Sequence, residues 1–83
     1  MPLYMDVHTK VEGAKAKDVA EAHRKDVATQ SKYGVKYLKY WFDEKNGRIY
    51  CLAEAPNKDA AIRVHREAHG LVADEINEVT ENS

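Results

Sequence analysis

The sequence contains a single cysteine, Cys51, among 83 residues, and this scarcity excludes an internal disulfide framework. A lone thiol fits a reducing compartment. No apolar run approaches the ~20 residues that cross a bilayer, and the N-terminus lacks the basic and apolar regions of a signal peptide. We therefore expect a cytoplasmic protein that does not associate with membranes.

The sequence also has no excess of charge of either sign, since 13 Lys and Arg stand against 14 Asp and Glu. A nucleic-acid partner is disfavoured, because neutralising phosphates needs a basic excess. A glycine-rich phosphate loop, a Cys-x-x-Cys pair and a Ser, His, Asp order are all missing. Nucleophilic catalysis by Cys51 would need a base at hydrogen-bond distance, so no motif indicates an enzyme.

What the sequence does have is hydrophobic periodicity that switches between strand and helix. Leu3 to His8 alternate apolar and polar side chains, as a strand with one apolar face does. Asn46-Gly47 signals a hairpin turn in which both residues are expected to take positive φ, and Asn57 is placed to cap a helix. The predicted strands are 3–8, 35–43, 49–55 and 76–80, and the predicted helices are 16–32 and 58–69.

This order of elements predicts the fold class. We expect residues 1–83 to form one α+β domain, a ferredoxin-like βαββαβ sandwich with a four-stranded antiparallel sheet and two helices on one face. The expected strand order is 4-1-3-2, and we take the two central strands, 3–8 and 49–55, to run parallel. A domain of this size buries only ~60% of its unfolded surface, so a partner subunit is expected to cover more.

The second and third strands are apolar or aromatic on both sides, although the helices can cover only one face of the sheet. Strict alternation puts Val35, Tyr37, Lys39 and Trp41 on one side of the second strand, and Leu38, Tyr40 and Phe42 on the other. A large exposed apolar patch usually marks an interface. We therefore predict a homodimer in which a second copy covers the open sheet face.

His65 and His69 lie four residues apart near the end of the second predicted helix, so their side chains project from the same face. Two imidazoles at this separation can share one metal ion. A His near a helix C-terminus is also favourable for electrostatic reasons alone. The order His-x-Glu-x-His is not the zinc protease motif, so we reject a metalloprotease.

His23 is predicted to face the sheet between Ala20 and Val27, either as a hydrogen-bonded core residue or as a metal ligand. Cys51 is expected to point toward the helices, in the same layer as His23 and His65. A buried small apolar residue is the simpler interpretation of this Cys. A Cys with two His would alternatively suit nickel, copper or zinc.

His8 and Glu54 form a second candidate cluster. If the central strands are parallel, both residues lie near their carboxyl ends, and we expect both to face the open side of the sheet, with Asp6 and Tyr4 beside His8. There they would be buried in a dimer, where an unpaired charge is costly. A plain hydrogen-bond network and a metal or small-ligand site are both compatible with this pattern.

Several segments together resemble a family of small bacterial nickel-binding ferredoxin-like proteins, otherwise grouped with domains of unknown function. The resemblance spans nearly the whole chain. It implies a ferredoxin-like dimer that binds nickel, at one place or more, with no established reaction, and it implies nickel binding by His8, His65 and His69 and by His23, Cys51 and Glu54. The segments are Met5-Asp6-Val7-His8, Tyr33-Gly34-Val35-Lys36-Tyr37, Tyr40-Trp41-Phe42, Cys51-Leu52-Ala53-Glu54-Ala55-Pro56, Val64-His65-Arg66-Glu67-Ala68-His69-Gly70 and Ala73-Asp74-Glu75-Ile76.

We therefore predict a non-catalytic accessory or metal-responsive protein that binds Ni(II). Copper or zinc remain alternatives, because affinity order alone favours Cu(II) over Ni(II) at a site of N and O donors. A second interpretation is a small-ligand-binding protein or enzyme of the dimeric α/β-barrel type, which would use His23, Trp41 and Glu54 in a pocket between helices and sheet. A third is a purely structural dimer module.

Overall fold

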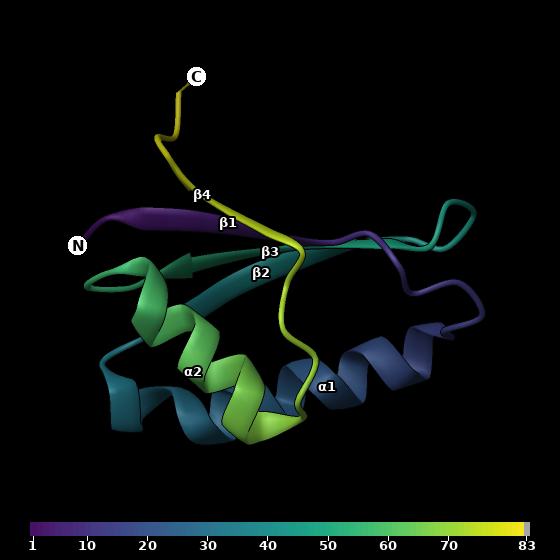
Figure 1. The fold of residues 1–83 in the computed structure, drawn as a ribbon, viewed down its shortest axis with the longest axis horizontal. Helices are drawn as coiled ribbons and strands as arrows, with labels where there is room; N and C mark the ends of the chain where they lie inside the picture. Colours follow the sequence, from purple (N-terminus) through teal and green to yellow (C-terminus); the bar gives the residue numbers. More distant parts are fainter. Residues whose placement is uncertain (83) are drawn as a thin grey trace.

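The computed structural model describes residues 1–82, and within them the six predicted elements are present (Figure 1). A short 3-10 helix, η1 (Gln30–Tyr33), follows the first helix. In this part of the chain no helix has the length and apolar character needed to cross a bilayer. The strands are β1 (Leu3–His8), β2 (Lys36–Asp43), β3 (Arg48–Glu54) and β4 (Glu75–Val79), and the helices are α1 (Ala16–Thr29) and α2 (Lys58–Ala68).

The four strands form one sheet in the order β2-β3-β1-β4, and both helices pack on one face of it (Figure 1). This confirms the ferredoxin-like fold class and the expected strand order. The central strands β1 and β3 run antiparallel, however, with Leu3 opposite Glu54 and His8 opposite Ile49. The prediction that they are parallel is wrong. The helices connect β1 to β2 and β3 to β4, which are not neighbours in the sheet, and β3 pairs antiparallel with β2 as it does with β1.

The polar side of β1, rather than its apolar side, faces the helices. Tyr4, Asp6 and His8 are buried, whereas the alternate residues Leu3 and Met5 are only half-buried on the open face. The expectation that His8 faces the open side is therefore wrong. The polar side chains are buried here because they contact polar groups from the helices, which the alternation pattern alone does not reveal.

A β-bulge at Leu38 reverses the alternation of β2. Tyr37 pairs with Ala53 and Lys39 pairs with Leu52, so Leu38 is an extra residue between them. Beyond the bulge, Tyr40 and Phe42 turn toward the helices and Trp41 turns to the open face, where it is 47% exposed. Strict alternation wrongly grouped Trp41 with Tyr37.

The face that α1 buries differs from the predicted one, on which His23 lies between Ala20 and Val27. Val19 and Asp26 are its buried residues, and they lie seven positions apart on one side of the helix. Val27, which was expected to face the sheet, is 46% exposed. A carboxylate is buried in its place because Asp26 has a buried cationic partner on α2, described below.

The ends of α2 follow the sequence signals. The Asn57 side chain accepts a hydrogen bond from the backbone N of Ala60 at 2.9 Å, which caps the first turn. At the other end, Gly70 has a φ of +79°, and its backbone N donates to the carbonyl of His65 at 2.9 Å. These caps fix the length of α2 and thereby the position of His65 and His69 over the sheet.

Gly47 ends the loop between β2 and β3 and supports the segment after β1. Its φ is +66°, and its carbonyl accepts a hydrogen bond from the backbone N of Val11 at 3.0 Å. Asn46 does not take positive φ, so only half of the expected turn geometry is present. A Cβ on Gly47 would lie 2.8 Å from the backbone N of Glu12, so the position excludes other side chains.

We expect Gly47→Ala to lower the free energy of unfolding by about 1–3 kcal/mol, from the cost of positive φ and the contact with Glu12. Urea denaturation measures this loss. The matched control is Gly13→Ala, because Gly13 also has positive φ but a Cβ there meets nothing within 4 Å. Equal losses in the two variants would contradict the role assigned to the close approach.

Candidate metal centre

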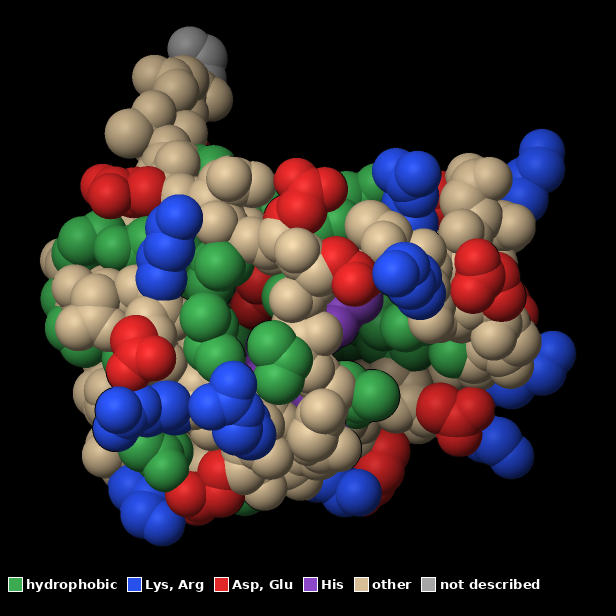
Figure 2. Space-filling view, viewed as in Figure 1, with side chains coloured by type: hydrophobic (Ala, Val, Ile, Leu, Met, Phe, Trp, Pro, Cys, Tyr) green, Lys and Arg blue, Asp and Glu red, His purple; other side chains and the backbone are tan. Residues whose placement is uncertain are grey.

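All four histidines of the chain and its only cysteine line one small cavity between the helices and the sheet. Its volume is about 30 Å³, which is enough for an ion with one or two water molecules. Figure 2 shows histidine atoms at the floor of a hollow in this face of the molecule. The ligand-type residues around the cavity are His8, His23, Asp26, Cys51, His65 and His69.

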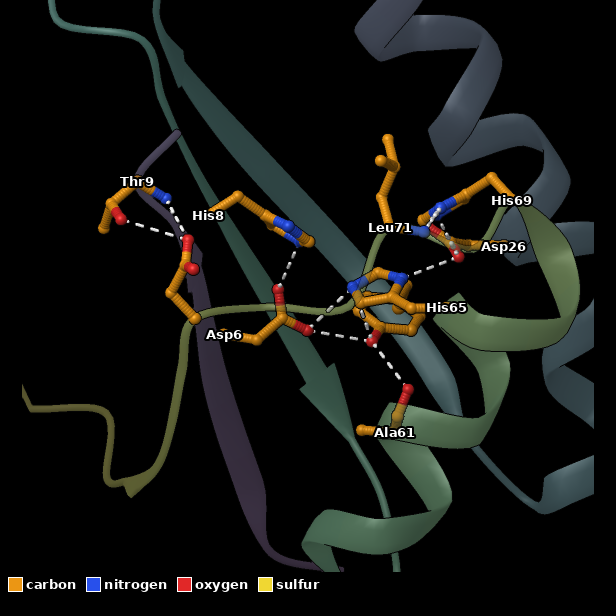
Figure 3. A network of polar contacts seen from close by, with 10 residues as sticks. Asp6, His8, Thr9, Asp26, Ala61, His65, His69 and Leu71 are labelled. Carbon is orange, nitrogen blue, oxygen red and sulfur yellow. Dashed lines mark hydrogen bonds and ion pairs between the residues drawn. The ribbon is translucent and has the colours of Figure 1, made fainter. Parts of the chain in front are cut away.

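His65 lies at the centre of this group, 2% exposed, between two buried carboxylates (Figure 3). Its Nε2 is 2.9 Å from Oδ2 of Asp6, and its Nδ1 is 2.8 Å from Oδ1 of Asp26. The hydroxyl of Tyr37 donates to the same Oδ2 of Asp6 at 2.9 Å, and the Tyr37 ring stacks on the imidazole. The network thereby joins β1, α1, α2 and β2.

Two further histidines stand at the ends of this network. Nε2 of His8 is 3.4 Å from Oδ1 of Asp6, and Nε2 of His69 is 3.0 Å from Oδ1 of Asp26. Neither contact has hydrogen-bond geometry, and Oδ1 of Asp6 and Nε2 of His69 are buried without a hydrogen-bond partner among residues 1–82. A buried polar atom without a hydrogen-bond partner lowers stability through its desolvation penalty, and this site has two such atoms.

Burial and the paired charges set the protonation states. Burial would lower the pKa of His65, but hydrogen bonds to Asp26 and Asp6 outweigh it and raise that pKa to about 11. Burial would raise the pKa of Asp6, yet the His65 and His8 contacts hold it far below its usual range, and the pKa of Asp26 is lowered in the same way. Two carboxylates against one imidazolium leave one excess negative charge.

The donor set fits a divalent transition metal. Ligand atoms of Asp6, His8, Cys51 and His65 all lie within 4.8 Å of one another, and so do those of Asp26, His65 and His69. Imidazole, carboxylate and thiolate together suit nickel, copper or zinc. Burial raises the pKa of Cys51 to about 11, so the sulfur is a thiol until a cation replaces its proton.

The structure brings together only part of the site expected from the sequence. His8, Cys51, His65 and His69 belong to the two donor groups. His23 lines the cavity, but its ring packs on Tyr40 and belongs to neither group.

Glu54 lies elsewhere, so its expected proximity to His8 is wrong. Because β1 and β3 are antiparallel, Glu54 sits opposite Leu3, at the far end of β1 from His8. Neither Glu54 nor Trp41 lines the cavity that His23 lines. The three residues of the alternative ligand pocket therefore do not share one pocket.

Sequence reasoning missed Asp26 and Tyr37, and noted Asp6 only as a neighbour of His8. Asp26 was the hardest to find, because it falls beside the apolar-looking stripe of α1 and resembles a solvent-facing charge. One signal was available: Asp26 stands three residues after His23 and seven after Val19, which is helical spacing for a single face. Tyr37 was assigned to a face without any reason to expect a hydrogen-bonding role.

A family model described as "Nickel responsive protein SCO4226-like" matches residues 4–79. The chain belongs to the SCO4226-like family. A solved structure of SCO4226 from Streptomyces coelicolor A3(2) is similar over 98% of this chain and 99% of that chain, with 38% sequence identity and a TM-score of 0.91. A comparison with curated proteins found no match. The resemblance predicted from the sequence is thus confirmed at the level of the family.

Proposed function

We propose that the chain binds Ni(II) in the cavity between helices and sheet and acts as a non-catalytic accessory or metal-responsive protein. The single observation that carries this proposal is the convergence of every histidine and the only cysteine on one cavity beside two buried carboxylates. The description of the family as nickel responsive supports nickel over other metals.

We propose Asp6, His8, Cys51 and His65 as the principal ligands, with His69 and His23 on the wall of the same cavity. The unpartnered Oδ1 of Asp6 supports this choice, because a cation would satisfy it. A divalent ion that replaces the His65 proton also balances the negative charge of the two carboxylates of Asp6 and Asp26. Zinc and copper suit the same donors.

The dimensions of the cavity favour an ion over an organic ligand. Pockets for small organic molecules usually hold ~300–1,000 Å³, whereas this cavity holds about 30 Å³. The size of this cavity therefore does not support the alternative of a small-ligand enzyme that uses it.

Isothermal titration of untagged protein with Ni(II) tests the proposal. We expect one ion per chain, and we expect His8→Ala and His65→Ala each to weaken binding at least tenfold. Glu54→Gln is the matched control, because Glu54 was predicted as a ligand but lies away from the cavity. Wild-type protein that retains no Ni(II) after dialysis without chelator would contradict the proposal.

We also propose a homodimer through the open sheet face. Half-buried Leu3, Met5 and Leu52 and the exposed Trp41 give this face an apolar surface on the side of the sheet opposite the cavity. Each metal site would therefore be complete within one subunit. A cytoplasmic location is part of the proposal, supported by the free thiol of Cys51.

A charge placed on the open face should separate the dimer without affecting the metal site. We expect Leu52→Glu to halve the mass measured by light scattering, because the new carboxylate would have to be buried beside Met5 of the same sheet. The stoichiometry of Ni(II) per chain should stay at one. Val27→Glu is the control, an exposed apolar residue on α1 away from this face, and it should remain dimeric. A monomeric wild type would refute the dimer.

A further inference from the structure

The two nitrogens of the His65 ring face two different donor groups. Nε2 points toward Asp6, on the side of His8, and Nδ1 points toward Asp26, on the side of His69 (Figure 3). Cys51 belongs to the group on the Nε2 side. A neutral imidazole has one nitrogen free to bind a metal, and the other carries hydrogen. The ring can therefore give its free nitrogen to only one of the two sides.

On the Asp26 side, two ring nitrogens lie close to one carboxylate oxygen, and only that of His65 has hydrogen-bond geometry. The backbone N of Leu71 donates to Nδ1 of His69 at 3.1 Å, so the hydrogen of a neutral His69 ring is on Nε2. That Nε2 lies 3.0 Å from Oδ1 of Asp26, the same oxygen that Nδ1 of His65 approaches at 2.8 Å. For His69 to act as a ligand through Nε2, its hydrogen would have to leave.

The Asp6 side is arranged differently. It holds four ligand atoms instead of three, one of them a thiol, and Oδ1 of Asp6 has no hydrogen-bond partner. The buried carboxylate oxygen that lacks a hydrogen-bond donor is therefore on the Nε2 side of His65. A cation placed there would contact the unpartnered oxygen and take the free nitrogen of the ring, while Nδ1 kept its hydrogen bond to Asp26.

We infer that Asp26 is a positioning residue, which holds the His65 ring by Nδ1 so that Nε2 is presented to the ion, and that His69 lies beside Asp26 without binding the ion. This inference rests on the proposed function and specifies its ligand set. The arrangement is a carboxylate–histidine–metal triad, in which the outer carboxylate fixes the ring and raises its basicity.

Variants of Asp26 test the inference by titration with Ni(II). We expect Asp26→Asn to keep one ion per chain and the visible absorption bands of bound Ni(II), with affinity 10–100-fold weaker. Glu21→Gln is the matched control, since it removes a carboxylate from an exposed position on the same helix, and its affinity should equal that of wild type. Wild-type affinity in Asp26→Asn would overturn the inference. Altered absorption bands would also overturn it, because they would indicate that Asp26 is itself a ligand of the ion.

A measurement on the wild-type chain covers the case in which Asp26→Asn fails to fold. In protein loaded with diamagnetic Zn(II), long-range ¹H–¹⁵N NMR of the His65 ring should show a hydrogen on Nδ1 and none on Nε2. Loss of the Nδ1 hydrogen with Nε2 still protonated would place the ion beside Asp26 and overturn the inference. The proposed function fails separately, through the absence of bound Ni(II) in the titration, so the two failures are distinguishable.

Discussion

A His65→Leu variant is expected to lose about 3–5 kcal/mol of unfolding free energy in metal-free buffer at pH 6, measured by urea denaturation. Removing the imidazolium leaves the carboxylates of Asp6 and Asp26 buried without their shared cation. The matched control is His23→Leu, the same substitution at a half-buried ring that packs on Tyr40 and forms no ion pair within residues 1–82. It should change the stability by less than about 1 kcal/mol, and equal losses in the two variants would contradict this account of the network.

The same network gives wild-type stability a characteristic pH dependence. The pKa of His65 is raised from 6.5 to about 11, so its contribution is complete below pH 6.5 and is lost as the pH rises toward 11. The pKa values of Asp6 and Asp26 are lowered from 3.8, so their contributions are complete above that pH and are lost as the pH falls below it. Metal-free stability should therefore be greatest between these limits, in mildly acidic solution.

Between pH 7 and 9 the stability of the wild type should fall with a slope approaching about 1.4 kcal/mol per pH unit. Denaturation midpoints at closely spaced pH values measure this slope. His23→Leu should retain it and His65→Leu should lose it. A flat wild-type profile over this range would mean that the His65 ring is not held as a cation by the two carboxylates.

Binding of Ni(II) at pH 8 is expected to release at least one proton per ion. The metal-free ring of His65 is protonated at this pH because its pKa is about 11, and a ligating nitrogen must give up its proton. Titration calorimetry in two buffers with different ionisation enthalpies counts the protons. For each proton released, the affinity should accordingly rise by up to about tenfold per pH unit from pH 7 to 9.

The thiol offers an internal control for this count. Cys51, with a pKa raised to about 11, also carries its proton at pH 8, so a thiolate ligand would release a second one. Cys51→Ser should then reduce the count by one, whereas Glu54→Gln should leave it unchanged. Release of no proton in the wild type would contradict ligation by His65, whatever the affinity.

The fold was predictable because its signals are local. Alternation in β1, the Asn57 cap and the glycine after α2 each act within a few residues, and together they specify the order of elements. The features that were predicted wrongly depend on contacts between residues far apart in the sequence. The bulge at Leu38 depends on how β2 pairs with β3, and the direction of β3 relative to β1 depends on where the crossovers run.

The candidate site was predictable in its residue types and not in its geometry. Histidine and cysteine are rare in this chain, so His8, Cys51, His65 and His69 were easy to single out. Asp26 and Asp6 were harder to single out, because the chain has 14 acidic residues. Which of them are buried depends on His65, which lies 39 positions from Asp26 and 59 from Asp6. The expected proximity of Glu54 to His8 was wrong for a different reason, because it depended on the direction of β3 relative to β1.

The central claim is that the cavity beside His65 holds the ion. The most direct test is an anomalous difference map, recorded at the nickel absorption edge, from crystals of untagged protein grown with Ni(II). We predict a peak inside the cavity, within coordination distance of Nε2 of His65 and Oδ1 of Asp6. Peaks confined to the protein surface, with the His65 ring still hydrogen-bonded to both carboxylates, would contradict the claim.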